Sequence, residues 1–219
     1  SLLDFLVQIG LDKEKLVISH FEETSIREAT AGKYEIDTNF PTDPMLSYWQ
    51  ELGIQSSQLI PDKTRDTLLS LNIFGKPTPW GYRNEVHYKY KGKILDIATV
   101  EFVPFHPIFK DDKIIGLKQN PHAIAISAIG FERVLMILGD KDNIWEIDTI
   151  KPLVEMVLNE SNDKGEIQAV IFVQAFRVIH KIISDGFLYK ALNVKRRKII
   201  RGFYKSLVDS IKKLNITNI

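Results

Sequence analysis

The stretch PTPWGYRNEVHYKYKGKILDIATVEFVPF, from Pro77 to Phe105, decides the fold. It predicts a strand over Glu85–Tyr90 and a tight reversal at Lys91–Lys93, because a glycine between two alternating runs is typical of a hairpin. A longer strand should follow over Ile94–Phe105, and Pro104 and Pro107 should end it, since proline donates no hydrogen bond to a neighbouring strand. The stretch therefore predicts an antiparallel sheet at the centre of the protein.

The second of these strands carries acids in its middle. Regular alternation would place Asp96 on one face of the sheet and Thr99 and Glu101 on the other. A carboxylate that is buried in a sheet needs a charged partner or a function. The acids could receive a cationic group or a metal, or each could pair with a neighbouring basic residue such as Arg83. The histidines are scattered, so no metal site is predicted.

A second stretch, AIAISAIGFERVLMIL over Ala123–Leu138, predicts a strand that runs into a helix after Gly130. The strand has few polar atoms, so we expect it to be central in the sheet. The helix carries Arg133 in its first turn, where a guanidinium suits a triphosphate. Alternatively, Arg133 pairs with Glu132 or with a surface acid. We expect the two stretches to form one site built on the sheet.

Composition narrows the class of protein. The chain has 219 residues, of which 44% are apolar, enough for one large or two small domains. It has no cysteine, which excludes disulfides, thiol catalysis and a cysteine zinc site. No apolar run approaches the ~18 residues of a membrane span, and the N-terminus lacks a basic leader. We therefore expect a cytoplasmic protein with no membrane partner.

The C-terminal part predicts helices. The polar segment NESNDKG, Asn159–Gly165, is the best boundary, which gives an α+β domain over residues 1–160 and a helical domain over 161–219. Ile167–Ile183 is apolar almost all round and predicts a mostly buried helix. Between Lys190 and Lys213 there are nine basic residues and one acid, Asp209. This asymmetry is the footprint of a polyanion site, or it is a solvated helix face.

Four blocks of the sequence resemble, in the same order, the catalytic half of alanyl-tRNA synthetase, a class II aminoacyl-tRNA synthetase. The central hairpin is similar to its glutamate turn and long strand, and IGFERVLMIL resembles the glycine-x-glutamate-arginine core of motif 3. The other blocks are the opening LLDFLVQIGLDKEKLVISHFE with MLSYWQELGI, and the helices AFRVIHKIISDG and VKRRKIIRG. The resemblance implies an antiparallel sheet of class II type with helices, followed by an all-α tRNA-recognition domain.

The resemblance also implies roles for single residues, although it identifies no catalytic residue. ATP, with Mg²⁺ and without zinc, would be bound by Arg133, Glu132 and Gly130. The substrate pocket would be lined by Trp80, Glu85, Asp96, Thr99, Glu101 and Ile126. The acceptor arm of tRNA would be contacted by Arg177, Lys195, Arg196, Arg197, Lys198, Arg201 and Lys205.

The chain departs from the family pattern at several points. Motifs 1 and 2 have no counterpart in it, and motif 2 carries the arginine that holds the ATP α-phosphate. The family's strand asparagine falls on Thr99, and the family's valine falls on Glu101. The aspartate that receives the amino group of the substrate falls on Ile126. An ammonium ion facing isoleucine would lack a counter-charge, which costs several kcal/mol in a pocket.

Three functional hypotheses follow. In the first, the protein is an aminoacyl-tRNA ligase that activates alanine with ATP and transfers it to tRNA, provided that a second polypeptide supplies motifs 1 and 2. In the second, it is a non-catalytic paralogue that binds tRNA or another RNA, and not DNA. In the third, it is a structural or oligomer-forming partner. We expect that the chain alone does not activate alanine.

Overall fold

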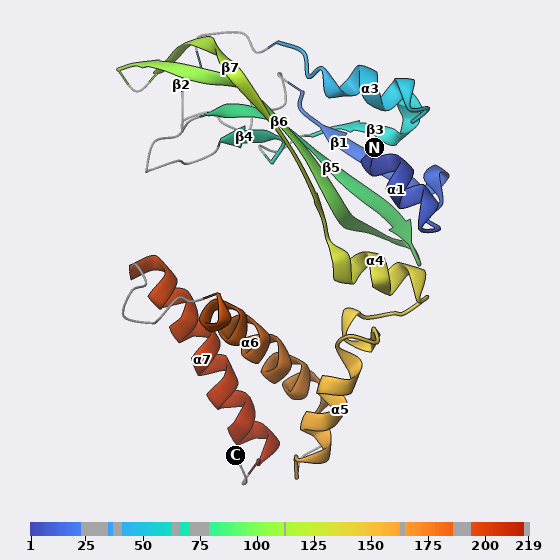
Figure 1. The fold of residues 1–219 in the computed structure, drawn as a ribbon, viewed down its shortest axis with the longest axis vertical. Helices are drawn as coiled ribbons and strands as arrows, with labels where there is room; N and C mark the ends of the chain where they lie inside the picture. Colours follow the sequence, from blue (N-terminus) through green and yellow to red (C-terminus); the bar gives the residue numbers. More distant parts are fainter. Residues whose placement is uncertain are drawn as a thin grey trace. The chain divides into compact units, whose positions relative to one another are not determined.

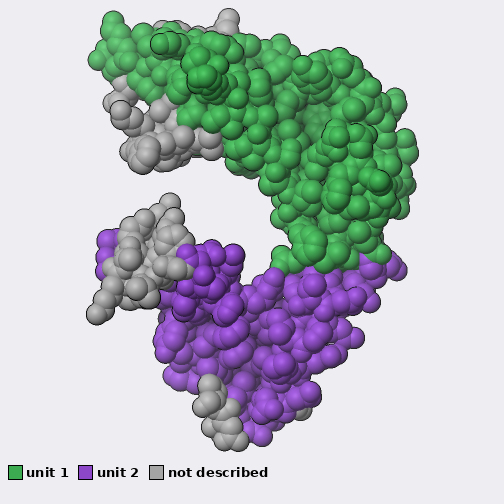
Figure 2. Space-filling model, viewed as in Figure 1, with its two compact units in different colours: residues 1–138 green, residues 139–219 purple. Residues whose placement is uncertain are grey.

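The computed structural model describes residues 1–22, 35–36, 41–62, 66–70, 79–111, 113–162, 165–185 and 194–216. The chain forms two compact units, Ser1–Leu138 and Gly139–Ile219 (Figure 2). The first unit combines a sheet with helices, and the described residues of the second form helices and their connections. The boundary predicted at Asn159–Gly165 lies inside the second unit.

The first unit is built on a mixed sheet of seven strands (Figure 1). Their order is β2-β7-β6-β5-β1-β3, and β4 also pairs with β5. Neighbouring strands are antiparallel except β1 with β3 and β2 with β7, which are parallel. The strands are β1 (Leu16–His20), β2 (Glu35–Ile36), β3 (Leu59–Pro61), β4 (Leu68–Ser70), β5 (Trp80–Tyr90), β6 (Lys93–Lys110) and β7 (Lys113–Ile129).

Helices accompany the sheet in the first unit and make up the second. In the first unit they are α1 (Leu2–Gln8), η1 (Lys13–Lys15), α3 (Met45–Glu51), η2 (Ser56–Gln58) and α4 (Phe131–Leu138). In the second they are η4 (Ile144–Glu146), α5 (Lys151–Asn159), α6 (Glu166–Ser184) and α7 (Val194–Leu214).

The predicted hairpin is confirmed, and its strands are longer than expected. The turn between β5 and β6 has Lys91 at φ 46° and Gly92 at φ 75°, the left-handed conformations that a tight hairpin turn requires. The prediction that Pro104 and Pro107 end the second strand is wrong, because β6 continues to Lys110. The ladder is irregular between Val103 and Phe105, and such a break tolerates a residue without an N–H group.

One face of β5 is covered by helices and forms the core of the first unit. Asn84 and Val86 are completely buried there. The indole Nε1 of Trp49 donates to Asn84 Oδ1 at 2.7 Å, and Asn84 Nδ2 donates to Asp43 Oδ2 at 2.7 Å. The other oxygen of Asp43 accepts from the backbone N–H of Met45, at the start of α3. This chain of hydrogen bonds fixes α3 to the sheet.

The strand β7 differs from its prediction in length and place. It is one strand over Lys113–Ile129, so the strand predicted before Gly130 begins earlier than Ala123. The central position expected for Ala123–Ser127 is wrong, because within the described part of the chain these residues pair with β6 alone. Ile124 is 38% exposed and Ile126 is 37% exposed. The low content of polar atoms in this segment therefore did not predict its burial correctly.

The second unit packs α6 against α5 and α7. The buried residues of α6 are small or medium-sized: Ala169, Val173 and Ala175. The prediction of a mostly buried helix is wrong, because Ile167 is 70% and Phe176 is 52% exposed. Among the described helices, α6 alone is long and apolar enough to cross a membrane. This differs from the expectation that no segment of the chain is long and apolar enough to do so. Core helices of water-soluble proteins pass this same test of length and composition.

Candidate functional site

Most of the predicted pocket residues lie together on the other face of β5 and β6. Residues directly opposite each other on antiparallel strands share a face, and this register pairs Arg83 with Glu101, Glu85 with Thr99, and His87 with Asp96. These six residues, Arg83, Glu85, His87, Asp96, Thr99 and Glu101, are the polar face.

A bulge brings Asp96 to this face. Val86 lies opposite Ala98, yet His87 lies opposite Asp96, so Ile97 is an extra residue in β6. A bulge of this kind shifts the alternation of side chains by one residue. The prediction that Asp96 and Glu101 occupy opposite faces is therefore wrong.

Arg83 and Glu101 form the more buried ion pair of the polar face. Nε and Nη2 of Arg83 each lie 2.8 Å from Oε1 of Glu101. The Glu101 side chain is 10% exposed and that of Arg83 is 31% exposed. Arg83 Nε also lies 3.6 Å from Oε1 of Glu85. The alternative in which Glu101 pairs with Arg83 is thus the one that the structure shows.

Arg133 and Asp96 form a second, more exposed ion pair. Nη1 of Arg133 donates to Oδ2 of Asp96 at 2.7 Å, and both side chains are more than two-fifths exposed. The pair joins the first turn of α4 to β6. A Cβ atom at Gly130 would lie 3.0 Å from Nε of Arg133, so the glycine leaves room for the guanidinium. The position of Arg133 brings the two predicted stretches together on one face.

The polar face perturbs two of its titratable groups. Burial raises the pKa of Glu85, the charge of Asp96 adds to that rise, and Arg83 opposes it. Burial lowers the pKa of His87, and Asp96 opposes that fall. The Nε2 atom of His87 lies 3.2 Å from the hydroxyl of Ser19 on β1. The fold therefore disfavours the charged forms of both Glu85 and His87.

Trp80, another predicted pocket residue, does not lie on the polar face. Trp80 is 2% exposed, so it packs in the core and does not line an open pocket. The hydroxyl of Thr99 donates to the carbonyl oxygen of Asn84 at 3.4 Å. Sequence reasoning missed Ser19, because nothing local in the sequence shows that β1 pairs with β5. In the described part of the chain, no group of three or more histidine or acidic side chains could hold a metal ion.

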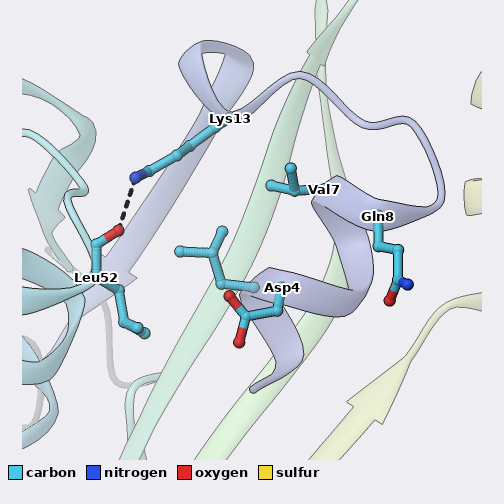
Figure 3. Close-up of a pocket in the computed structure, with 6 residues that line it drawn as sticks. Asp4, Val7, Gln8, Lys13 and Leu52 are labelled. Atoms are coloured by element: carbon cyan, nitrogen blue, oxygen red, sulfur yellow. Dashed lines mark hydrogen bonds between the residues drawn. The ribbon is translucent and has the colours of Figure 1, made fainter.

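A hollow of about 340 Å³ lies between α1, η1 and the end of α3 (Figure 3). It is lined by Leu3, Asp4, Val7, Gln8, Lys13 and Leu52. The Nζ atom of Lys13 donates to the carbonyl oxygen of Leu52 at 2.6 Å, which satisfies the C-terminal end of α3. The hollow contains none of the predicted site residues.

Comparison with known proteins finds distant relatives. No family model matches the chain. It is 27% identical to an alanine–tRNA ligase of Prochlorococcus marinus (strain MIT 9301), over 95% of its own length and 23% of the relative's length. It is 22% identical to the alanine–tRNA ligase of Schizosaccharomyces pombe (strain 972), over 73% of its own length and 16% of that relative. The chain is related to alanyl-tRNA synthetases.

A mitochondrial alanine–tRNA ligase of Saccharomyces cerevisiae (strain S288c) is more distant, at 21% identity over 68% of the chain and 15% of the relative. The chain therefore spans less than a quarter of these alanyl-tRNA synthetases.

The predicted substrate-pocket residue Ile126 lies on β7. Ile126 lies directly opposite Glu101, so a carboxylate is present one strand away from the position where the resemblance predicts an aspartate.

The residues predicted to contact tRNA lie on two helices of the second unit. Lys198, Arg201 and Lys205 are exposed on α7, and Arg197 is half-buried. Lys195 and Arg196 fall within α7, but their side chains lie outside the described ones. Arg177 is on α6, where its Nη1 donates to Oε1 of Gln174 at 3.2 Å.

Proposed function

We propose that this alanyl-tRNA synthetase-related chain binds the acceptor arm of tRNA through α7. Alanine activation then depends on residues beyond these 219, on the same polypeptide or on a second one. The observation that carries the proposal is the division of α7 into an apolar side and a basic side. The names of the relatives, which are alanine–tRNA ligases, support tRNA as the polyanion that such a helix would bind.

The apolar side of α7 fixes the direction of the basic side. Leu214 is buried, and Leu207, Val208 and Ile211 are half-buried in the same stripe. Lys198, Arg201 and Lys205 recur at helical spacing and are all exposed. Like charges at this spacing repel one another, and phosphates relieve the repulsion while releasing counterions.

Such contacts position an RNA more than they read its sequence. RNA helices present phosphates and 2′-hydroxyls more readily than the edges of their bases. We therefore expect α7 to contribute affinity for the acceptor arm and little discrimination between tRNAs.

The polar face is a poor triphosphate site as it stands. Arg133 already donates to Asp96, and Arg83 already pairs with Glu101. Glu85, Asp96 and Glu101 would place three carboxylates near an ATP molecule that needs cations around it. Further arginines or Mg²⁺ would have to come from elsewhere. This charge balance supports RNA binding as the function of the chain and activation as a property of a larger assembly.

Charge reversal on α7 tests the proposal. The double variant Arg197→Glu/Arg201→Glu should weaken tRNA binding at low salt by a few kcal/mol, at ~1–2 kcal/mol per phosphate contact. The slope of log affinity against log salt should become less steep by about 1 to 2. Filter binding of tRNA at several salt concentrations measures both quantities.

The matched control is Lys212→Glu/Lys213→Glu, which makes the same change of net charge on two exposed lysines at the other end of α7. We expect it to retain most of the affinity. If the first double variant binds tRNA like the parent with the same salt slope, the basic side of α7 is only a solvated surface. Alanine-dependent ATP–pyrophosphate exchange by the chain alone would contradict the second part of the proposal.

A further inference from the structure

Tyr204 on α7 is exposed at a position where helical spacing predicts burial. By spacing it belongs with Ile200, Leu207 and Ile211, which lie on the apolar side of the helix. Those three residues are half-buried, whereas Tyr204 is 61% exposed. Its phenol ring is therefore an apolar surface that the described residues of the second unit leave open to solvent.

Basic side chains lie beside this ring on the same helix. Arg201 is three residues before Tyr204 and Arg197 is seven residues before it, so both lie along the same side of α7. Lys205 follows Tyr204 directly and is exposed. With a rise of about 1.5 Å per residue, Arg201 lies about 4.5 Å from Tyr204 along the helix axis. Successive phosphates of one strand of a duplex are separated by a similar distance, ~3.4 Å along its axis.

An aromatic ring beside several cations is the arrangement that binds an unpaired nucleotide. The cations hold the phosphates, and the ring stacks on the base. A base inside a duplex already has both of its faces covered by its neighbours, so only an unpaired or terminal base can offer one. Stacking requires no particular base, because every base has a π-face. The chemistry of this part of α7 therefore fits an unpaired base that follows a stretch of bound phosphates.

We infer that Tyr204 stacks on an unpaired nucleobase at the end of an RNA duplex. The phosphates of that duplex are held by the exposed cations of α7: Lys198, Arg201 and Lys205. The inference rests on the proposed function and narrows its ligand, because the acceptor arm of a tRNA is a duplex that ends in unpaired 3′ nucleotides. Phosphate contacts alone would let α7 bind anywhere along a duplex. The ring instead places α7 at the end of the duplex, without reading its sequence.

Three RNA hairpins with the same stem test the inference in filter-binding titrations. One has an unpaired 3′ overhang, one is blunt, and one has an overhang of abasic residues, which keeps the phosphates and removes the bases. The parent should bind the first about tenfold more tightly than the other two. Tyr204→Ala should lose this preference and bind the blunt hairpin like the parent, with the same salt slope. Tyr204→Phe should keep the preference, because stacking does not need the hydroxyl group.

Tyr48 on α3 provides a matched control, since it is 62% exposed and Tyr204 is 61% exposed. Tyr48→Ala should bind all three hairpins like the parent. A 2-aminopurine base at the first overhang position reports stacking directly. Its fluorescence should be quenched when the parent or Tyr204→Phe is bound at saturation, and should not be quenched by Tyr204→Ala. Tyr204→Ala should unfold at the same urea concentration as the parent, because the ring is mostly exposed.

Several outcomes overturn the inference while leaving tRNA binding by α7 intact. They are equal affinity of the parent for the overhang and blunt hairpins, full affinity for the abasic overhang, and a preference that survives in Tyr204→Ala. A loss that is equal for all three hairpins in Tyr204→Ala also overturns it, because the ring would then support the helix and not the base. If no hairpin is bound with a salt-dependent affinity, the proposed function fails, and this inference fails with it.

Discussion

The two faces of β5 use neighbouring residues of one strand for different purposes. On the helix-covered face, Asn84 is completely buried and hydrogen-bonds with both Trp49 and Asp43. On the polar face, the flanking Arg83 and Glu85 are partly exposed and meet other charges at 2.8 to 3.6 Å. Alternation along a strand thus separates residues that hold the fold from residues that can meet a ligand.

The largest expected effect is on the covered face. Asn84→Leu should lower the free energy of unfolding by about 3 kcal/mol, because Trp49 loses its acceptor and the carboxyl group of Asp43 loses a donor. Burial already raises the pKa of Asp43, and the Asn84 hydrogen bond opposes that rise. Urea denaturation measures the loss. The control on the polar face is Thr99→Val, which should cost less than about 1 kcal/mol; equal losses would mean that the two faces do not differ in this way.

The next prediction compares how much each ion pair of the polar face contributes to the free energy of unfolding. Glu101→Gln should lower the free energy of unfolding by about 2 kcal/mol, because it leaves the half-buried guanidinium of Arg83 without its main counter-charge. Asp96→Asn should cost about 0.5 kcal/mol, because its pair with Arg133 is well exposed and is screened by water and salt. Unfolding curves of both variants at low and at high salt measure these two losses. A larger loss for Asp96→Asn would reverse our view of which pair is structural.

A smaller effect concerns ATP. Any affinity of the polar face for ATP with Mg²⁺ should fall about tenfold in Arg133→Ala, or ~1.4 kcal/mol, because a charged donor to phosphate is lost. Asp96→Asn should instead strengthen binding, because it releases Arg133 from its intramolecular partner. Calorimetric titration measures both variants. Parent-like binding by Arg133→Ala would show that the motif 3 interpretation of this arginine is wrong.

The smallest effect is a pH dependence with opposite signs at two neighbouring residues. Since the pKa of His87 lies below its ordinary 6.5 in the folded protein, the unfolded chain takes up this proton first. Stability should therefore fall as the pH falls below about 6.5. The pKa of Glu85 lies above its ordinary 4.5, so its contribution favours folding at low pH and is lost as the pH rises past that value.

Single variants separate the two contributions. His87→Gln should flatten the pH dependence of the unfolding free energy just below pH 6.5, and Glu85→Gln should flatten it just above pH 4.5. Urea denaturation at a series of pH values gives both slopes. Unchanged slopes in either variant would contradict the burial of that group.

Local signals in the sequence were sufficient for the hairpin of β5 and β6. They also placed Thr99 and Glu101 correctly on one face. They failed where distant segments decide the outcome. The exposure of Ile167 on α6 and of Ile126 on β7 depends on what lies alongside, which periodicity does not report.

The extra residue at Ile97 affects how a site residue can be assigned to a homologue from a sequence alignment. A column in an alignment records order along the chain, whereas a ligand meets one side of a sheet. A homologue of equal length without the bulge would turn the acid aligned with Asp96 toward the helices, although the column still showed a carboxylate. A homologue shorter by that one residue would keep its acid beside the arginine of α4, although the column showed a gap.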